Sequence, residues 1–251
     1  MVKPLLVGRA ALVTGAGAGL GLAIARRFAE EGARGLAVDR AAGPDALPDG
    51  WIAHAADVAH EDAVAAAFAA AGRRFGALDV VVANAGVVPP WSEIESLDLG
   101  EWDRVFSVNV RGVAATLKHA VPLMRARGGA IVVMASLNAQ RAHPRQALYT
   151  ATKHAVLGLV RAAAADLGRY GIRVNAIGPG PVATDALRAR VAARAAASGA
   201  APEAELAALA ASTHLGRIAT PDDVAAAALV LASDLSAAIT GQIVPVDGGL
   251  G

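Results

Sequence analysis

Residues 14–21 read TGAGAGLG and connect a short apolar run to a helical pattern. Gly15, Gly19 and Gly21 permit a tight turn and a close approach of the backbone to a phosphate group. A helix that begins at such a turn directs unpaired backbone N–H groups and the positive end of its dipole to the same place. A glycine cluster alone also fits a flexible turn, but the position between strand and helix favours a phosphate-binding turn. The stretch therefore predicts a fold that begins with a strand, a glycine turn and a helix.

Short apolar runs alternate with longer helical patterns along the rest of the chain. Runs that are apolar throughout are typical of parallel strands buried on both faces, and right-handed crossovers place helices on both sides of such a sheet. The sequence therefore predicts an α/β fold, a doubly wound, Rossmann-like, seven-stranded parallel sheet with helices on both faces. The expected strands are Ala10–Thr14, Gly35–Asp39, Trp51–Asp57, Leu78–Asn84, Ala130–Ser136, Arg173–Ile177 and Gln242–Val246. The expected helices are Gly19–Glu31, Glu61–Phe75, Leu99–Arg125, Tyr149–Tyr170 and Pro221–Ser233.

The sequence indicates one domain that contains a long alanine-rich insertion. No Pro/Ser linker, charge block or repeat interrupts residues 1–251, so the sequence predicts a single domain. The segment from Asp185 to Ala211 is alanine-rich and too long for an ordinary connection. Insertions of this kind are usually binding loops or lids, and we expect a substrate lid near residues 182–215.

Composition limits the classes of function. A formal net charge of +1 gives no reason to expect nucleic acid or an anionic membrane surface as a partner. The absence of cysteine excludes disulfides and thiol nucleophiles, and no histidine has partners at metal-ligand spacing. The apolar residues 10–25 carry four glycines and are followed by two arginines, which fits a strand, turn and helix better than a signal peptide. We expect a soluble, cytoplasmic protein without a bound metal.

Acidic residues at two strand ends bear on the cofactor. Asp39 ends the second expected strand, where a carboxylate can accept hydrogen bonds from both ribose hydroxyls of an adenosine and repels a 2′-phosphate. Arg40 follows and could pair with such a phosphate. Asp57 and Val58 are placed to meet the adenine, although Asp57 equally fits a helix N-cap. The sequence favours NAD, with NADP as the alternative.

Residues 136–153 contain a tyrosine and a lysine on one helical face. Tyr149 and Lys153 are four positions apart, so on a helix they lie one turn from each other. Ser136 lies upstream, at the end of the apolar run that begins at Ala130. Taken alone, the Tyr149 and Lys153 pair fits a solvated helix surface beside an unrelated serine.

Several independent motifs together change that interpretation, because in order and placement they resemble the short-chain dehydrogenase/reductase family over essentially the whole chain. The matching stretches are the TGxxxGxG turn at Thr14–Gly21, the NAG motif at Asn84-Ala85-Gly86, the central-helix asparagine at Asn109, the serine at Ser136, the YxxxK pair at Tyr149 and Lys153, and the PGxxxT stretch at Pro179-Gly180 and Thr184. The resemblance implies an enzyme that transfers a hydride between a secondary alcohol and a nicotinamide.

The resemblance implies Asn109, Ser136, Tyr149 and Lys153 as catalytic residues. A secondary alcohol loses a hydride only as its hydroxyl proton leaves, so the site needs a base near neutral pH. An ordinary tyrosine, with a pKa of about 10, is a poor base. Lys153 and the positive oxidised nicotinamide would lower that pKa and make Tyr149 the general base. Ser136 would hold the substrate oxygen, and Asn109 would fix a water that relays protons from Lys153.

The cofactor set combines the glycine turn, the strand ends and the family motifs. Asn84 has a structural interpretation of equal weight, as a brace of the central sheet, and Thr14 is expected to order the glycine turn. The predicted cofactor-binding residues are Gly15, Gly17, Gly19, Leu20, Gly21, Asp39, Arg40, Asp57, Val58, Asn84, Ala85, Gly86, Tyr149, Lys153, Pro179, Gly180, Val182 and Thr184.

The substrate is less determined than the reaction. Asn138 and Gln146 are amides near the catalytic serine and tyrosine, and a site that pairs with hydroxyls favours a sugar or polyol. Both amides could equally point away from the site. The predicted substrate-binding residues are Ser136, Asn138, Gln146, Tyr149 and Trp91. The expected partner is therefore a small-molecule alcohol or ketone.

Two alternative functions are an acyl-carrier-protein reductase and an inactive dinucleotide-binding protein. An NADPH-dependent 3-oxoacyl-(acyl-carrier-protein) reductase would use two arginines to dock its acidic partner, but those positions hold Arg127 and Tyr170 here. Asp39 also argues against NADPH. A catalytically inactive dinucleotide-binding sensor or scaffold would typically lack the tyrosine or the lysine, and both are present. The resemblance implies a homotetramer joined through the helices expected at 99–125 and 149–170.

Overall fold

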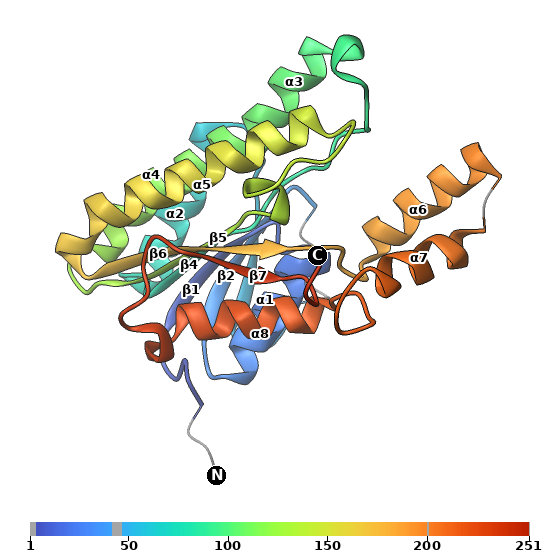
Figure 1. Ribbon diagram of the computed structural model, residues 1–251. Coiled ribbons are helices and arrows are strands. Elements are labelled where there is room, and N and C mark those ends of the chain that lie inside the picture. The colour runs from blue at the N-terminus through green and yellow to red at the C-terminus, as the bar shows by residue number, and fades with distance from the viewer. Residues whose placement is uncertain (1–3, 42–46, 200, 251) are drawn as a thin grey trace.

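A parallel sheet with the strand order β3-β2-β1-β4-β5-β6-β7 forms the centre of the protein (Figure 1). The computed structural model describes residues 4–41, 47–199 and 201–250. All paired strands run parallel. The strands are β1 (Ala10–Thr14), β2 (Arg34–Asp39), β3 (Trp51–Ala55), β4 (Val80–Ala83), β5 (Gly129–Met134), β6 (Ile172–Pro179) and β7 (Ile243–Val246).

Helices cover both faces of this sheet, so the predicted doubly wound fold is confirmed. Figure 1 shows α2, α4 and α5 on one face and α1 and α8 on the other. The helices are α1 (Gly19–Glu30), α2 (Glu61–Phe75), α3 (Leu99–Phe106), α4 (Gly112–Met124), α5 (Ala147–Leu167), α6 (Asp185–Ser198), α7 (Pro202–Ala211) and α8 (Pro221–Ala232). Within the described ranges, no helix has the length and apolar character needed to cross a membrane.

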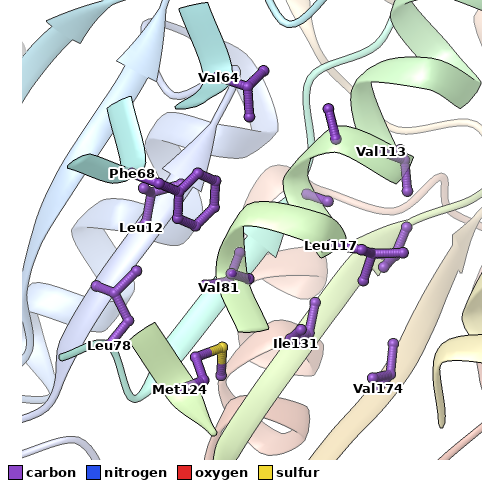
Figure 2. Close-up of a cluster of buried hydrophobic side chains, with 14 of the residues drawn as sticks. Leu12, Val64, Phe68, Leu78, Val81, Val113, Leu117, Met124, Ile131 and Val174 are labelled. Carbon is purple, nitrogen blue, oxygen red and sulfur yellow. The ribbon is translucent and has the colours of Figure 1, made fainter. Parts of the chain in front are cut away.

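The strands form a core on both sides because their apolar residues alternate between the two helical layers. Val81 of β4 packs in the cluster that contains Phe68 of α2 and Leu117 of α4, as Figure 2 shows. Its neighbours Val80 and Val82 pack in the second cluster, beneath α1 and α8. Burial on both faces explains why the strand is apolar at every position. Because β1 leads to β2 on one side and β4 pairs on the other, a crevice is expected where these neighbours diverge at their carboxyl ends.

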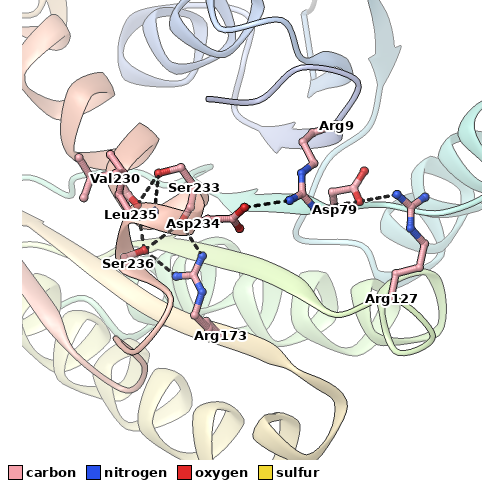
Figure 3. A network of polar contacts seen from close by, with 9 residues as sticks. All are labelled: Arg9, Asp79, Arg127, Arg173, Val230, Ser233, Asp234, Leu235 and Ser236. Carbon is pink, nitrogen blue, oxygen red and sulfur yellow. Dashed lines mark hydrogen bonds and ion pairs between the residues drawn. The ribbon is translucent and has the colours of Figure 1, made fainter. Parts of the chain in front are cut away.

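A buried carboxylate ties together the opposite, amino-terminal edge of the sheet. Asp79 is 3% exposed and accepts a 2.9 Å hydrogen bond from the backbone N–H of Ala10. Arg127 lies 2.9 Å from this carboxylate and Arg9 lies 3.6 Å from it. Figure 3 shows the three side chains together. Two partners and a backbone donor offset the cost of burying the charge. The Arg127 guanidinium therefore has a structural partner at the edge away from the strands' carboxyl ends.

Several boundaries differ from the sequence expectations. The helix expected over 99–125 is divided into α3 and α4 by a π-helical turn at Ser107–Arg111. β3 ends at Ala55, so Asp57 lies in the following turn, where its carboxylate accepts a 2.9 Å hydrogen bond from Ala59 N–H. The N-cap of α2 is His60, which corrects the alternative interpretation of Asp57 as that cap.

The expected lid region forms a helical hairpin. Helices α6 and α7 lie side by side and project beyond the carboxyl ends of the strands in Figure 1. The side chain of Thr184 caps α6 by accepting a 3.2 Å hydrogen bond from Leu187 N–H. We refer to residues 185–211 as the α6–α7 hairpin.

Candidate active site

A cleft of about 900 Å³ lies at the carboxyl ends of the strands. It extends from the glycine turn after β1 to the start of the α6–α7 hairpin, and Asp185, Leu187 and Arg190 of α6 also line it. Most of the sequence-predicted site residues line it together: Gly15, Gly19, Leu20, Asp39, Arg40, Asp57, Val58, Asn84, Ala85, Gly86, Ser136, Tyr149, Lys153, Pro179, Gly180, Val182 and Thr184. Gly17, Gly21, Asn109, Asn138, Gln146 and Trp91 are not among the residues that line it.

The glycine turn fits a dinucleotide because its backbone is packed too closely for side chains. A Cβ atom on Gly21 would lie 2.1 Å from the carbonyl oxygen of Gly15. Gly15 has a positive φ of 66°, and a Cβ there would lie 2.8 Å from Cα of Ala85. The turn thus leaves bare backbone at the start of α1, where a helix N-terminus can receive a diphosphate.

Asn84 and Thr14 hold this turn against the central strands. Asn84 Nδ2 donates hydrogen bonds to the carbonyl oxygens of Thr14 (2.9 Å) and Gly15 (3.0 Å). The Thr14 hydroxyl oxygen accepts hydrogen bonds from the backbone N–H groups of Asn84 (3.0 Å) and Ala85 (3.1 Å). Asn84 therefore braces the turn, and its amide nitrogen is engaged with the backbone.

The carboxylate of Asp39 is held at the end of β2 by two backbone groups. Gly17 N–H donates a 2.9 Å hydrogen bond to Oδ2, and Ala41 N–H donates a 3.2 Å hydrogen bond to Oδ1. A Cβ on Gly17 would lie 2.9 Å from the carboxyl carbon, so a larger residue here would displace the carboxylate. The neighbouring Arg40 is exposed. A fixed negative charge thus lies at this end of the cleft, with a solvated positive charge beside it.

Ser136, Tyr149 and Lys153 meet at the other part of the cleft. Ser136 follows β5, and Tyr149 and Lys153 lie in the first two turns of α5. Lys153 Nζ donates a 2.9 Å hydrogen bond to the carbonyl oxygen of Met134 and lies 5.5 Å from the centroid of the Tyr149 ring. The Met134 carbonyl thereby fixes the lysine beneath the tyrosine.

Burial has the largest effect on the pKa values of Tyr149 and Lys153. It raises the pKa of Tyr149, and a hydrogen bond with Ser136 and the positive charge of Arg190 offset part of this rise. It also lowers the pKa of Lys153 to about 8. The sequence predicted a lowered tyrosine pKa with Lys153 and the nicotinamide as its causes. In the protein itself the direction is opposite, because desolvation of the phenolate outweighs the nearby hydrogen bond and charge.

Asn109 lies on the π-helical turn and is fully buried. Its Oδ1 accepts a 2.8 Å hydrogen bond from Val87 N–H, and its Nδ2 donates one of 2.8 Å to the Val87 carbonyl. A Cβ on Gly86 would lie 3.3 Å from Asn109 Oδ1 and 3.9 Å from Lys153 Nζ, so the asparagine and lysine converge on this glycine. The π turn gives the amide its orientation toward the loop after β4.

The two amides expected in the substrate site contact each other. Asn138 Nδ2 donates 3.0 Å hydrogen bonds to Gln146 Oε1 and to the hydroxyl of Thr150. Asn138 Oδ1 accepts a 3.4 Å hydrogen bond from Ser136, and the serine oxygen accepts one of 3.2 Å from Asn138 N–H. Asn138 thus orients the serine and joins the loop after β5 to α5.

The α6–α7 hairpin contacts the loop after β4. The guanidinium of Arg194 lies 4.6 Å from the centroid of the Trp91 ring and 3.0 Å from Glu205 of α7. Sequence reasoning did not identify Arg194 or Arg190, since an arginine in an alanine-rich helix carries no signal of what it faces. In the described part of the chain, no group of three or more His, Asp or Glu side chains is arranged to hold a metal ion.

Comparison with known proteins identifies the class to which this fold and site belong. A family model described as "Enoyl-(Acyl carrier protein) reductase" matches residues 15–251. The cis-4-hydroxycyclohexanecarboxylate dehydrogenase of Sinomonas cyclohexanicum is 39% identical over 96% of each chain. Short-chain dehydrogenase reductase 5 of Arabidopsis thaliana is 38% identical over 97% of this chain and 95% of its own. The ligand-free aldohexose dehydrogenase of Thermoplasma acidophilum has a TM-score of 0.89 and 32% identity, over 98% of this chain and 94% of its own.

The chain belongs to the short-chain dehydrogenase/reductase family. It is an oxidoreductase that acts on CH–OH groups of small molecules, and the family uses nicotinamide cofactors. The sequence-based prediction of the family and enzyme class is therefore confirmed.

Proposed function

We propose that the protein is an NAD-dependent dehydrogenase of a small, hydroxylated secondary alcohol, with Tyr149 as the general base. The observation that carries this proposal is one cleft that holds the Asp39 carboxylate at one end and the group of Ser136, Tyr149 and Lys153 at the other. The bare glycine turn lines the same cleft, which suits an extended dinucleotide.

The residues present fit a dinucleotide. The turn at Gly15, Gly19 and Gly21 would hold the diphosphate, and Asp39 would accept hydrogen bonds from the adenosine ribose. Thr184 and Lys153 would bind the nicotinamide half. The bound nicotinamide supplies the acceptor for a hydride. The fixed charge of Asp39 would repel a 2′-phosphate, which favours NAD over NADP.

The protein's own part is to position the alcohol and take its proton. Ser136 would hold the substrate oxygen, with its hydroxyl oriented by Asn138. The phenolic oxygen of Tyr149 would accept the hydroxyl proton. Because burial raises the tyrosine's pKa, the base needs positive charge close by, and Lys153 and Arg190 are the cations of the cleft near it. The side-chain amide of Asn109 pairs with both the N–H and the carbonyl group of Val87. Asn109 would thereby keep the loop after β4 in place for a proton path from Lys153.

The relatives support the substrate class. One is named for a hydroxylated cyclohexanecarboxylate and another for an aldohexose, and each compound is a small ring that carries hydroxyl groups. A sugar, polyol or similar hydroxylated ring is therefore the proposed substrate. The α6–α7 hairpin would serve as its lid, since it borders the cleft and contacts Trp91. We also propose a homotetramer joined through α4 and α5, which light scattering of the purified protein would test.

Reduction of a 3-oxoacyl thioester on acyl carrier protein is the second candidate, because the description of the matching family model also names an acyl-carrier-protein reductase, although one that acts on enoyl groups. The arginine expected to dock that acidic partner is Arg127, which already pairs with the buried Asp79. Position 170 is a tyrosine. The residues at these two positions therefore favour the alcohol dehydrogenase over the acyl-carrier-protein reductase.

The test is a titration of the purified protein with NAD(H) and NADP(H), followed by a panel of sugars, polyols and cyclic alcohols. We expect tighter binding of NADH and formation of NADH with at least one alcohol of the panel. Preference for NADPH together with reduction of 3-oxoacyl thioesters would replace this proposal with the second candidate.

A further inference from the structure

Arg190 brings a positive charge from α6 to the reacting end of the cleft. It is half-buried and lines the same cleft as Ser136 and Tyr149. Its charge and Tyr149 act on each other: Arg190 lowers the pKa of Tyr149, and after burial the tyrosine is the next largest influence on the pKa of Arg190. A guanidinium remains charged at neutral pH even when burial lowers its pKa. Arg190 is therefore a cation of the same cleft, and its charge and that of Tyr149 influence each other.

Arg104, which also lines the cleft, and Arg194 of α6 have carboxylate partners, but Arg190 has none in the ranges that the structure describes. Arg104 pairs with Glu101 at 2.7 Å, and Arg194 pairs with Glu205 at 3.0 Å. Asp185 also lines the cleft, but it is exposed in the first turn of α6, and no described ion pair joins it to Arg190. A partly desolvated cation without a partner is unfavourable, so an anion in the cleft would stabilise it.

We propose that Arg190 binds the carboxylate of the substrate, so that the alcohol oxidised at Tyr149 is a hydroxy carboxylic acid. This inference rests on the proposed function, because it assigns the charge of that same alcohol. One uncompensated guanidinium matches a monoanion, and a carboxylate can accept two parallel hydrogen bonds from it. The phosphates of the dinucleotide have other donors, the backbone N–H groups of the glycine turn.

The experiment compares two alcohols that differ in this charge. The probes are cis-4-hydroxycyclohexanecarboxylate and the neutral cis-4-methylcyclohexanol, with NAD as the acceptor. In Arg190→Met we expect kcat/KM for the hydroxy acid to fall about 10- to 100-fold, mainly through KM, as for loss of hydrogen bonds to a charged group. The value for the neutral alcohol should fall much less, because that substrate loses only the effect of Arg190 on the pKa of Tyr149. Arg188→Met is the matched control, because Arg188 is an exposed arginine on the same helix, and it should change neither value.

A binding measurement keeps this inference separate from the proposed function. Cyclohexanecarboxylate, which has no alcohol to oxidise, is titrated calorimetrically into the protein saturated with NADH. Binding that is lost in Arg190→Met supports the carboxylate site even if no alcohol is oxidised, in which case the proposed function fails and the inference stands. Equal binding by wild type and Arg190→Met, an equal loss of kcat/KM on both alcohols, or a weaker affinity of Arg190→Met for NADH would each overturn the inference. Turnover of alcohols with no dependence on charge would overturn it while leaving the proposed function intact.

Discussion

The backbone N–H of Gly17 donates a 2.9 Å hydrogen bond to Oδ2 of Asp39. The first residue belongs to the turn after β1 and the second ends β2, so this bond joins the two neighbouring strand ends. A Cβ on residue 17 would lie 2.9 Å from the carboxyl carbon of Asp39. The absence of a side chain at Gly17 therefore determines where the carboxylate of Asp39 stands.

Gly17→Ala should weaken NADH binding about 10-fold, because it displaces a carboxylate that would otherwise accept hydrogen bonds from the ribose. The dissociation constant, measured by NADH fluorescence, checks this. Gly158→Ala is the control, since a Cβ there meets nothing within 4 Å, and its affinity should match that of wild type. An unchanged affinity in Gly17→Ala would show that the position of Asp39 does not matter for the cofactor.

Asp39→Ser should change the preference toward NADP. The substitution removes the charge that repels a 2′-phosphate, while Arg40 stays exposed and is free to pair with it. We expect the ratio of kcat/KM for NADP to that for NAD to rise about 100-fold. The double variant Asp39→Ser, Arg40→Ala should lose most of that gain. If wild type already binds NADPH more tightly than NADH, the role assigned to Asp39 is wrong.

The fold was predictable from the sequence wherever local pattern determines the element. The run Val80–Ala83 is apolar at each position because it is buried on both faces, and positions 15 and 21 are glycine because a Cβ on Gly21 would clash with the backbone of Gly15. Such constraints act within a few residues and leave a visible signature. The family motifs then identified Ser136, Tyr149 and Lys153, which the structure brings to one cleft.

The parts that the sequence did not predict depend on contacts between distant segments. Nothing in the stretch SVNVR indicates a π turn, or that Asn109 pairs with the backbone of Val87, which lies 22 residues earlier in the chain. The hydrogen bond that Asn138 Nδ2 donates to Gln146 Oε1 is likewise visible only once the loop after β5 meets α5. Arg190 resembles the other arginines of its helix in sequence, and only the packing of α6 brings it to the cleft.

Tyr149→Phe should lower kcat by about 10²- to 10⁴-fold, the range for loss of a general acid or base. The ring that packs beside Lys153 is retained, so the affinity for NADH and the melting temperature should stay close to the wild-type values. Steady-state kinetics and a thermal melt of the same preparation check both parts. Activity within tenfold of wild type would exclude Tyr149 as the base.

Lys153 makes the stability of the protein depend on pH. Burial lowers the pKa of its ammonium group to about 8, whereas an unfolded lysine titrates at about 10.4. Between these values the unfolded state binds more protons, so the free energy of unfolding rises with pH from about 8 to about 10. This contribution is complete above the unfolded pKa and is lost as the pH falls through 8. The contribution of Tyr149 to the free energy of unfolding changes with pH in the opposite direction, because burial raises its pKa. That contribution is lost only above pH 10.

Urea unfolding of wild type and Lys153→Met at pH 7.5 and pH 9.5 tests this dependence. The difference in unfolding free energy, wild type minus variant, should increase by about 2 kcal/mol between the two pH values. Subtraction removes the titration of groups that the two proteins share. A difference that stays constant would mean that Lys153 titrates at its ordinary pKa in the folded protein.

Asn109→Ala should destabilise the protein as well as impair catalysis. The substitution leaves both backbone groups of Val87 without the side-chain amide that now pairs with them, at a cost of about 2 to 4 kcal/mol in unfolding free energy. Asn109→Asp keeps the acceptor for Val87 N–H but loses the donor to the Val87 carbonyl, so it should fall between Ala and wild type. Gln140→Ala, at an exposed amide, is the control and should change stability by less than about 0.5 kcal/mol. Urea unfolding measures all three, and a variant Asn109→Ala as stable as wild type would show that this amide does not hold the loop.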